Sequence, residues 1–465
     1  MVFSSITFLY YFLPIVLFFY FLVPWKWKNM ILLLSSLLFY FYGEPRYCIL
    51  LLFSSIFHYF IGKWIEHCHQ KRGRLLLLLF SLFINFGILF YFKYYNFFVQ
   101  SIDALFPQAF PYLNITLPIG ISFFTFQTAS YVIDIYREKV TSSKNVFHFM
   151  TYVSMFPQLI AGPIVRYETI AEELNKRKWQ VEEISLGIQR FVIGLAKKVM
   201  IADLLGEFSQ TLNDIAPSFL GLWLRAIADT LQLYFDFSGY SDMAIGLGLL
   251  FGFHFLENFN YPLIAKSITD FWRRWHMSLS SWFRDYLYIP LGGNRVSKSR
   301  YVLNLFCVWF ATGLWHGASW NFILWGLYFF LFLLLEKWFL LSFLNKHKWF
   351  GHFYTSILIL ISFVIFGRTD MADLVLTIKG MFGLDTIPIL NQEVLFYLKE
   401  YLVLLFLSIF LATPLLKKGY QKLQKKKKWK TSLTILEPIF YIGLFLLCTA
   451  FIIDASFQPF LYFRF

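Results

Sequence analysis

The chain has 465 residues, of which 58% are hydrophobic and only 15% are charged. About a quarter of the residues of a soluble protein are charged, so this composition excludes an ordinary soluble domain. A formal net charge of +14 at pH 7 would suggest nucleic-acid binding in a soluble protein. Here the Lys and Arg residues stand in short segments between apolar runs, as in the cytoplasmic loops of membrane proteins. We therefore expect a multi-pass membrane protein that contacts lipids and no nucleic acid.

Five apolar runs in the first third of the chain are predicted to be membrane spans. They lie at about 4–24, 29–43, 47–65, 75–99 and 115–133. Basic loops follow the first, third and fifth runs, at Lys26/Lys28, 63–74 and 137–144. Positive loops favour the cytoplasm, so the N-terminus is expected outside it. The first run lacks a cleavage site and is expected to be retained as a span.

The apolar segment 149–165 is interrupted by Pro157, Gly162 and Pro163. Irregular backbone is tolerated at membrane depth only where protein or a water-filled cavity surrounds it. This pattern favours a re-entrant element. The charged segment that follows, 166–183, is predicted to lie on the cytoplasmic surface.

The second half of the chain continues the same pattern. Further spans are predicted at about 184–203, 219–253, 301–318, 320–343, 353–367, 394–416 and 433–453. The lysine-rich run 417–430 is expected to contact anionic headgroups. No repeat or soluble boundary interrupts the chain, so residues 1–465 are expected to form a single membrane domain. The four cysteines are scattered, and no ligand cluster points to a metal site.

Two acidic residues, Asp236 and Asp242, stand deep in the apolar run 219–253 among small residues that let helix backbones approach closely. An acid at such a depth needs a partner. We favour a structural role in which a neighbouring group satisfies each carboxylate. The alternative is that they orient a histidine or an arginine of an active site.

The segment 267–289 is predicted to be one amphipathic helix. Ser267 and Asp270 fit a capping box, and Pro290 ends the pattern. The helical period places Trp272 and His276 on one apolar face. A lone histidine on an apolar face is as often a satisfied core residue as a functional one, and both interpretations stay open for His276.

His316 stands in a different setting, between glycines in the motif TGLWHGASW. The basic residues Arg295, Lys298 and Arg300 mark the expected cytoplasmic edge of its span. The 16 residues from Arg300 place His316 roughly 24 Å deep, beyond the midplane of a bilayer core about 30 Å thick. A neutral buried imidazole can accept a proton from a hydroxyl, so we expect His316 to be a general base. The alternative is a histidine that only bonds across helices.

Several long motifs carry a resemblance that covers nearly the whole chain. They are MVFSSITFLYYFLP at the start, LPIGISFFTFQTASYVIDIYR (117–137), FPQLIAGPIVRY (156–167), YFDFSGYSDMAIGLGLLFGF (234–253), ENFNYPLIAKSITDFWRRWHMSLSSWFRDYLYIPLGGNR (257–295), TGLWHGASW (312–320) and a terminal FLYFRF. The chain resembles the membrane-bound O-acyltransferase (MBOAT) family, in the AlgI-like branch that O-acetylates alginate in bacteria. The D-alanyl transfer proteins of teichoic acid modification are more distantly similar.

The resemblance implies an all-α fold of about eleven transmembrane helices, with re-entrant or interfacial helices around a central tunnel. It implies that His316 is the catalytic residue and His276 the second motif residue. It also implies a bacterial cytoplasmic (inner) membrane protein with no permanently bound cofactor. The donor would be cytosolic acetyl-CoA or a related thioester. The acceptor would be an extracytoplasmic glycan or a partner acetyltransferase of the SGNH type.

Two further groups of residues are assigned to this expected site. Basic residues near the inner mouth are candidates for steering the phosphates of coenzyme A. Each could equally be an interfacial anchor, and for Arg273 and Arg274 the anchoring role is favoured. The binding candidates are Arg273, Arg274, Arg284 and Arg295. The residues expected to support the site are Asp236, Asp242, Trp272, Trp275, Trp315 and Asn321.

Two other classes of protein are compatible with an apolar chain that carries buried charges. A transporter or flippase of glycans or lipids also places broken helices and charges near the midplane, but such proteins often contain an inverted repeat, which this sequence lacks. A scaffold that recruits a separate acetyltransferase is the second alternative.

Overall fold

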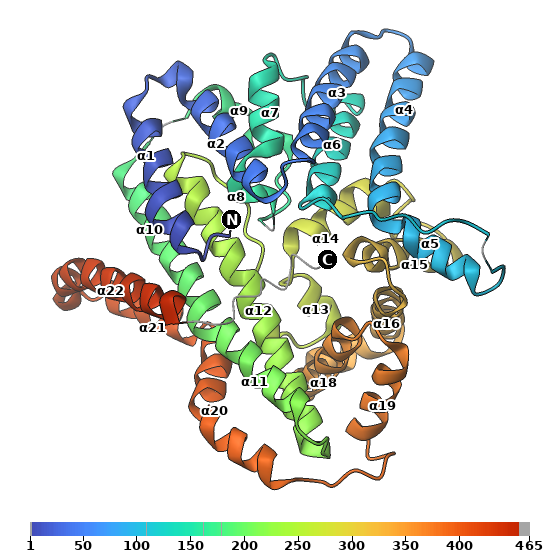
Figure 1. Ribbon diagram of the computed structural model, residues 1–465, viewed down its shortest axis with the longest axis vertical. Coiled ribbons are helices and arrows are strands. Elements are labelled where there is room, and N and C mark those ends of the chain that lie inside the picture. Colours follow the sequence, from blue (N-terminus) through green and yellow to red (C-terminus); the bar gives the residue numbers. More distant parts are fainter. Residues whose placement is uncertain (1, 108, 161, 178, 455–465) are drawn as a thin grey trace. The chain divides into compact units, whose positions relative to one another are not determined.

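The computed structural model describes residues 2–107, 109–160, 162–177 and 179–454, with the backbone alone for 427–430. These residues form helices joined by loops, without any β-strand among them, so the predicted all-α fold is confirmed (Figure 1). The terminal motif FLYFRF lies outside the described residues.

The helices group into two compact units. One contains Met1–Phe191 and Ser241–Leu256, and the other contains Val192–Tyr240 and Glu257–Phe465. The long helix α12 (Phe219–Leu250) contributes to both units. The expectation of a single domain over 1–465 stays a prediction.

The first unit contains the N-terminal helices. They are α1 (Leu13–Leu22), α2 (Lys28–Gly43), α3 (Cys48–His67), α4 (Lys71–Leu89), α5 (Tyr95–Asp103), α6 (Ile121–Tyr136), α7 (Val146–Ser154), α8 (Phe156–Leu159), α9 (Tyr167–Asn175) and most of α10 (Val181–Ala196). Helix α6 packs against α3 and α4, and α2 packs against α7 (Figure 1). The predicted break in 149–165 is confirmed, because α7 ends at Ser154 and the single turn α8 begins with Phe156-Pro157.

One cation that the sequence assigns to a loop is buried instead. Lys28 is only 3% exposed, and its Nζ donates to the carbonyl oxygen of Tyr20 at 2.7 Å. The same Nζ lies 3.7 Å from the ring centroid of Trp179. A lysine can bury its stem and hold its charge against aromatic faces. Lys28 is therefore the buried first residue of α2 rather than part of the basic loop that the sequence predicts.

The second unit contains the C-terminal half of the chain. Its helices are α11 (Asp203–Asp214), most of α12, α13 (Ile268–Trp272), α14 (Met277–Phe283), α15 (Lys298–His316), α16 (Trp320–Leu335), α17 (Leu341–Lys346), α18 (Lys348–Gly367), α19 (Met371–Met381), α20 (Gln392–Leu411), α21 (Leu415–Gln424) and α22 (Lys427–Asp454). Helix α16 packs against both α15 and α18, and this trio builds one wall of the site described below.

Six helical segments among the described residues are long and apolar enough to cross a membrane. They are Cys48–His67, Lys71–Asp103, Trp320–Lys346, Lys348–Gly367, Gln392–Leu411 and Thr431–Asp454. Thr7–Leu22 is a shorter apolar helix. The other expected spans are helical too, but they are shorter or more polar. A multi-pass membrane protein is therefore confirmed, and the count of about eleven spans and the central tunnel stay predictions.

Small residues let α12 approach α10 closely, as the sequence predicts. A Cβ atom added to Gly239 would lie 2.7 Å from the carbonyl oxygen of Gly194, closer than side-chain carbons come to oxygen. The two helix backbones therefore touch at this level of the second unit. This contact fixes the turn of α12 that carries Leu233 and Phe237.

Candidate active site

His316 is the last residue of α15, and the local sequence explains why the helix ends there. Ser297 caps the start of α15 by accepting a hydrogen bond from the backbone N–H of Arg300. The helix then runs without interruption to His316, and Gly317 continues in an extended conformation. The predicted rise from the basic segment to His316 is therefore confirmed as a single helix. Its depth in a membrane stays a prediction.

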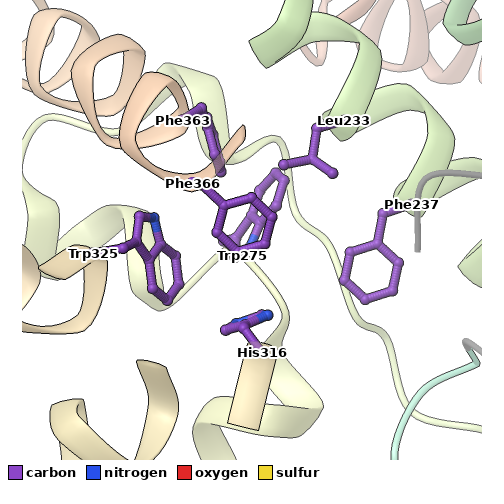
Figure 2. A pocket seen from close by; sticks show the side chains of 7 residues that line it. All are labelled: Leu233, Phe237, Trp275, His316, Trp325, Phe363 and Phe366. Atoms are coloured by element: carbon purple, nitrogen blue, oxygen red, sulfur yellow. The ribbon is translucent and has the colours of Figure 1, made fainter. Parts of the chain in front are cut away.

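The His316 ring points into a small pocket with aromatic walls (Figure 2). The pocket is lined by Leu233, Phe237, Trp275, His316, Trp325, Phe363 and Phe366. The ring centroid of His316 lies 4.8 Å from that of Trp325 and 5.2 Å from that of Phe366, both edge to face. The side chain is nearly inaccessible, with 4% exposure. No carboxylate is among these lining residues.

The pocket has room for little more than one water molecule. A thioester and a hydroxyl do not fit beside His316 together in this conformation. The walls are mostly aromatic side chains.

The single helix predicted over 267–289 is wrong. Ser267 does cap a helix, because its Oγ accepts from the backbone N–H of Asp270 at 3.0 Å. That helix, α13, ends at Trp272, and α14 begins only at Met277. Between them His276 adopts a left-handed backbone with φ of 43°. Because of this break, the segment has no continuous apolar face, and His276 lies in the turn between the two helices.

The turn brings His276 to the same aromatic cluster as His316. Its ring centroid lies 5.8 Å from that of Trp315 and 4.8 Å from that of Phe237. Trp315 in turn lies 5.0 Å from His316. The two histidines that the sequence singles out therefore share Trp315 as a neighbour, although His276 is fully buried and does not line the pocket.

Several of the predicted supporting residues lie in or beside this aromatic cluster. Trp275 lines the pocket, and Trp272 packs edge to face on Trp325 with a centroid distance of 5.6 Å. The Nδ2 of Asn321 donates to the carbonyl oxygens of Ile365 at 3.3 Å and Phe366 at 2.9 Å. Asn321 thus ties the start of α16 to the end of α18 and holds the pocket wall that carries Phe366.

Both predicted acids have cationic partners. The Nζ of Lys198 lies 2.9 Å from an oxygen of Asp236 and 2.6 Å from one of Asp203, and all three side chains are buried. In the first unit, an oxygen of Asp242 accepts from Arg190 at 2.9 Å. Each acid thus has the partner that its depth requires, and its structural role stays a prediction.

Sequence reasoning missed Lys198 and Asp203. The signal was present, because a lysine inside the apolar stretch GLAKKVMIADLL is costly without a partner. Asp236 stands between Leu233 and Phe237 on α12, so its ion pair to Lys198 anchors the helix that forms one side of the pocket.

None of the four arginines proposed for donor binding lines the pocket. Arg274 pairs with Asp270 at 2.9 Å, one helical turn away, and Arg284 pairs with Asp285 at 2.7 Å. Arg273 and Arg295 are exposed. The ion pairs reduce the positive charge that Arg274 and Arg284 offer to a phosphate. A binding role for the four arginines stays a prediction.

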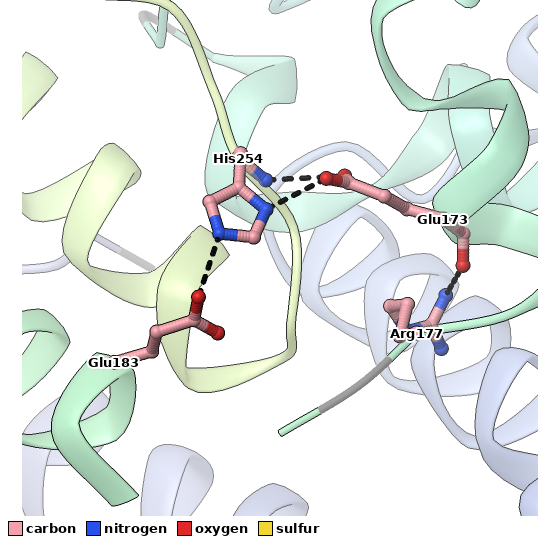
Figure 3. A network of polar contacts seen from close by, with 4 residues as sticks. All are labelled: Glu173, Arg177, Glu183 and His254. Carbon is pink, nitrogen blue, oxygen red and sulfur yellow. Dashed lines mark hydrogen bonds and ion pairs between the residues drawn. The ribbon is translucent and has the colours of Figure 1, made fainter. Parts of the chain in front are cut away.

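The first unit holds a polar network that the sequence did not predict (Figure 3). The Nδ1 of His254 lies 2.7 Å from the carboxylate of Glu173, and its Nε2 lies 3.3 Å from that of Glu183. Arg177 donates to the carbonyl oxygen of Glu173 at 2.9 Å. Partial burial lowers the pKa of His254, but the two carboxylates outweigh it and the pKa of His254 is raised overall.

The model of the membrane-bound O-acyltransferase (MBOAT) family matches residues 120–367 of this chain. The matched region contains both histidines, Asn321 and Asp236. The chain belongs to this family and is an O-acyltransferase.

Individual relatives refine the comparison. The probable alginate O-acetylase AlgI of Pseudomonas aeruginosa is 41% identical over 396 residues, which cover 83% of this chain and 76% of the relative. The peptidoglycan O-acetyltransferase of Helicobacter pylori is 40% identical over 361 residues, covering 70% and 68%. The teichoic acid D-alanyltransferase of Bacillus subtilis is 32% identical over 278 residues, covering 55% and 68%. The predicted resemblance to the alginate O-acetylation branch is thereby confirmed.

Proposed function

We propose that this protein moves an acetyl group from a cytosolic thioester, such as acetyl-CoA, to a hydroxyl on the opposite side of the bacterial cytoplasmic membrane. The acceptor is an exopolysaccharide such as alginate, a cell-wall glycan, or a partner acetyltransferase of the SGNH type that completes the transfer. The relatives named for alginate and peptidoglycan O-acetylation support a glycan as the final acceptor.

The observation that carries the proposal is the position of His316 at the end of an unbroken helix that begins in a basic segment. A donor that enters at the basic end and an acceptor that enters at the other end would meet at this imidazole. Chemistry at this point would carry only the acetyl group across, and coenzyme A would stay in the cytoplasm. With the basic loops in the cytoplasm, the N-terminus would lie on the opposite side of the membrane.

In the proposed reaction, His316 takes the proton of the acceptor hydroxyl while the hydroxyl oxygen attacks the thioester carbonyl carbon. The tetrahedral intermediate then collapses, the carbon–sulfur bond breaks, and the leaving thiolate takes the proton from the imidazolium. The products are an acetyl ester and a free thiol, and the imidazole is regenerated. The aromatic walls exclude water, which would otherwise hydrolyse the thioester.

Reconstituted vesicles test both the donor and the direction of transfer. Labelled acetyl-CoA is supplied on one side, a glycan acceptor on the other, and the acetyl ester formed on the acceptor is measured. We expect label to reach the acceptor only when acetyl-CoA faces the basic end of α15. If His316→Ala vesicles form the ester at the wild-type rate, the assignment of the base is wrong.

A further inference from the structure

A buried arginine follows the helix that carries one wall of the His316 pocket. Arg368 is the first residue after α18 and stands two residues after Phe366, which lines the pocket. Helix α15 ends at His316, and α16 begins four residues later. Asn321, in the first turn of α16, donates to the carbonyl oxygen of Phe366 at 2.9 Å. Arg368 therefore lies at the His316 end of α15, opposite the basic segment at which that helix begins.

A second arginine approaches the same place from α12. Arg225, Asp229, Leu233 and Phe237 recur every four residues and so follow one face of this helix, and the last two line the pocket. Asp229 and Arg225 stand about 6 Å and 12 Å before Leu233 along the helix axis. The charges of both residues act on Arg368. Two segments that leave the pocket thus bring two guanidinium groups near each other.

Both arginines are loosely paired. The Nε of Arg225 lies 3.9 Å from one oxygen of Asp229, whose other oxygen accepts from the hydroxyl of Ser209. The Nε of Arg368 lies 3.3 Å from an oxygen of Asp373. Both Nε atoms are buried, and neither has a hydrogen-bond acceptor among the described residues. A guanidinium has five N–H donors and binds a carboxylate or phosphate best through two parallel hydrogen bonds, which neither pair forms.

The negative charge around Arg368 does not balance the cost of its burial. Its side chain is only 5% exposed, and a buried charge is costly unless it is closely paired. Burial and the charge of Arg225 lower the pKa of Arg368 by more than Asp229 and Asp373 raise it. Asp373 is 57% exposed, so water screens much of its charge. An anion that joined the two arginines would supply both negative charge and hydrogen-bond acceptors.

The arginine cluster, defined as Arg225, Asp229, Arg368 and Asp373, is accessible from the surface. The side chains of Arg225 and Asp229 are 23% and 27% exposed. A ligand can therefore reach the cluster through Arg225 without entering a cavity, and Arg368 forms its buried part.

We propose that Arg225 and Arg368 bind a carboxylate of the acceptor, and that the acceptor is therefore an acidic glycan. This inference rests on the proposed function and names the chemical class of its acceptor. The donor is proposed to enter at the basic end of α15, and the arginine cluster lies at the other end. An acidic group held there anchors the glycan while one of its hydroxyls reaches His316.

Direct binding to the full-length protein tests the chemistry of the site. The protein is placed in nanodiscs of zwitterionic lipid, and the probe is a fluorescent oligouronate. The control probe is the same oligomer with its carboxyl groups reduced to alcohols. We expect the acidic probe to bind at least about 10-fold more tightly than the reduced one, and less tightly as salt is added. Absent binding of the acidic probe, or equal binding of both, overturns the inference.

Two competitors distinguish the acceptor from other carriers of an anionic group. Coenzyme A and a short-chain anionic phospholipid both carry phosphates that a guanidinium also binds. We expect neither to displace the acidic probe from the wild-type protein at equal concentration. Displacement by coenzyme A would assign the cluster to the donor, and displacement by the phospholipid would assign it to a lipid headgroup. Either result overturns the inference.

Variants separate ligand binding from a structural role. Arg225→Gln and Arg368→Gln should each weaken binding of the acidic probe about 10-fold or more. Asp373→Asn should tighten it by a few-fold, because a competing carboxylate is removed from Arg368. A purely structural ion pair would not produce this gain, so unchanged or weaker binding in Asp373→Asn contradicts the role of Arg368. Lys379→Gln is the matched control, since it removes an exposed cation of α19 outside the cluster and should leave binding unchanged.

Kinetics distinguish failure of this inference from failure of the proposed function. With the oligouronate as acceptor, Arg225→Gln should raise the KM for the oligomer about 10-fold or more and leave the KM for acetyl-CoA within a few-fold of wild type. Acetyl transfer with an unchanged KM for the oligomer would remove only the inference. Arginine-dependent binding without acetyl transfer would remove the proposed function and leave the acidic site intact. If Arg368→Gln does not fold, Arg225→Gln and Asp373→Asn decide the inference.

Discussion

His316 and His254 are the same side chain in opposite surroundings. His316 is surrounded by aromatic rings in a pocket whose lining contains no carboxylate. His254 lies between two carboxylates, and about half of its side chain is exposed. A catalytic base must take up and release a proton during the reaction. A fixed counter-ion beside the imidazole would hold it in the charged state. The two acids beside His254 raise its pKa and so favour its charged form. Residue type alone therefore does not distinguish the two histidines, and their neighbouring groups do.

The strongest test of this contrast is the loss of each imidazole in turn. We expect His316→Ala to lower acetyl transfer by about 10²–10⁴-fold, the usual contribution of a positioned general base. His254→Ala should stay within a few-fold of wild type, because no reacting group is proposed near it. Both variants are compared at equal amounts of folded protein in membranes, by the acetyl-ester content of the acceptor. A large loss in His254→Ala with normal folding would contradict the contrast.

The second test compares the buried ion pairs of Lys198 with the more exposed ion pair of Arg190. We expect Lys198→Met to destabilise the protein by about 3–5 kcal/mol, because the buried carboxylates of Asp203 and Asp236 lose the cation that pairs with both. Arg190→Met is the matched variant, since Arg190 and Asp242 are more exposed. Its effect should be smaller. Unfolding in detergent measures both, and equal losses would show that burial does not govern these pairs.

A third test addresses the wall of the His316 pocket. Asn321→Asp has nearly the same shape as the wild type but cannot donate to the carbonyl oxygens of Ile365 and Phe366 when ionised. Leaving such buried groups unpaired costs about 1–3 kcal/mol. We expect this loss of stability together with a lower kcat, because Phe366 packs on His316. Unchanged kcat in a destabilised variant would show that the wall does not position the histidine.

The smallest expected effect is the pH dependence of the His254 network. The pKa of His254 is raised in the folded state, so its bonds to Glu173 and Glu183 contribute fully below the ordinary histidine pKa of about 6.5. The contribution is lost as the pH rises through the raised folded pKa. The difference in Tm between wild type and His254→Ala should therefore shrink from about pH 6 upward. A difference that grows with pH would reverse the sign and contradict this account.

Local patterns in the sequence predicted most helices but not the charged or broken ones. The apolar runs from 29 to 99 and from 301 to 367 gave helices at nearly the expected positions. Helices α11 (Asp203–Asp214) and α19 (Met371–Met381) were missed, because their mixed polar faces do not stand out in a hydrophobic chain. The break at His276 was also missed. The turn there is hydrogen-bonded to Asn258, 18 residues away in the sequence, and the helical period carries no information about such a partner.

The sequence by itself determined that the protein is a multi-pass helical membrane enzyme, because hydrophobic length and motif order are local properties of the chain. It also singled out His316 and His276 by their residue type in an apolar setting. Only the tertiary structure decided what surrounds them. Trp325 and Phe366 reach His316 from two other helices, Asn258 holds the turn at His276, and Lys198 joins Asp203 to Asp236. These contacts depend on packing between distant segments, and packing sets the polarity and the hydrogen bonds that decide what each imidazole can do.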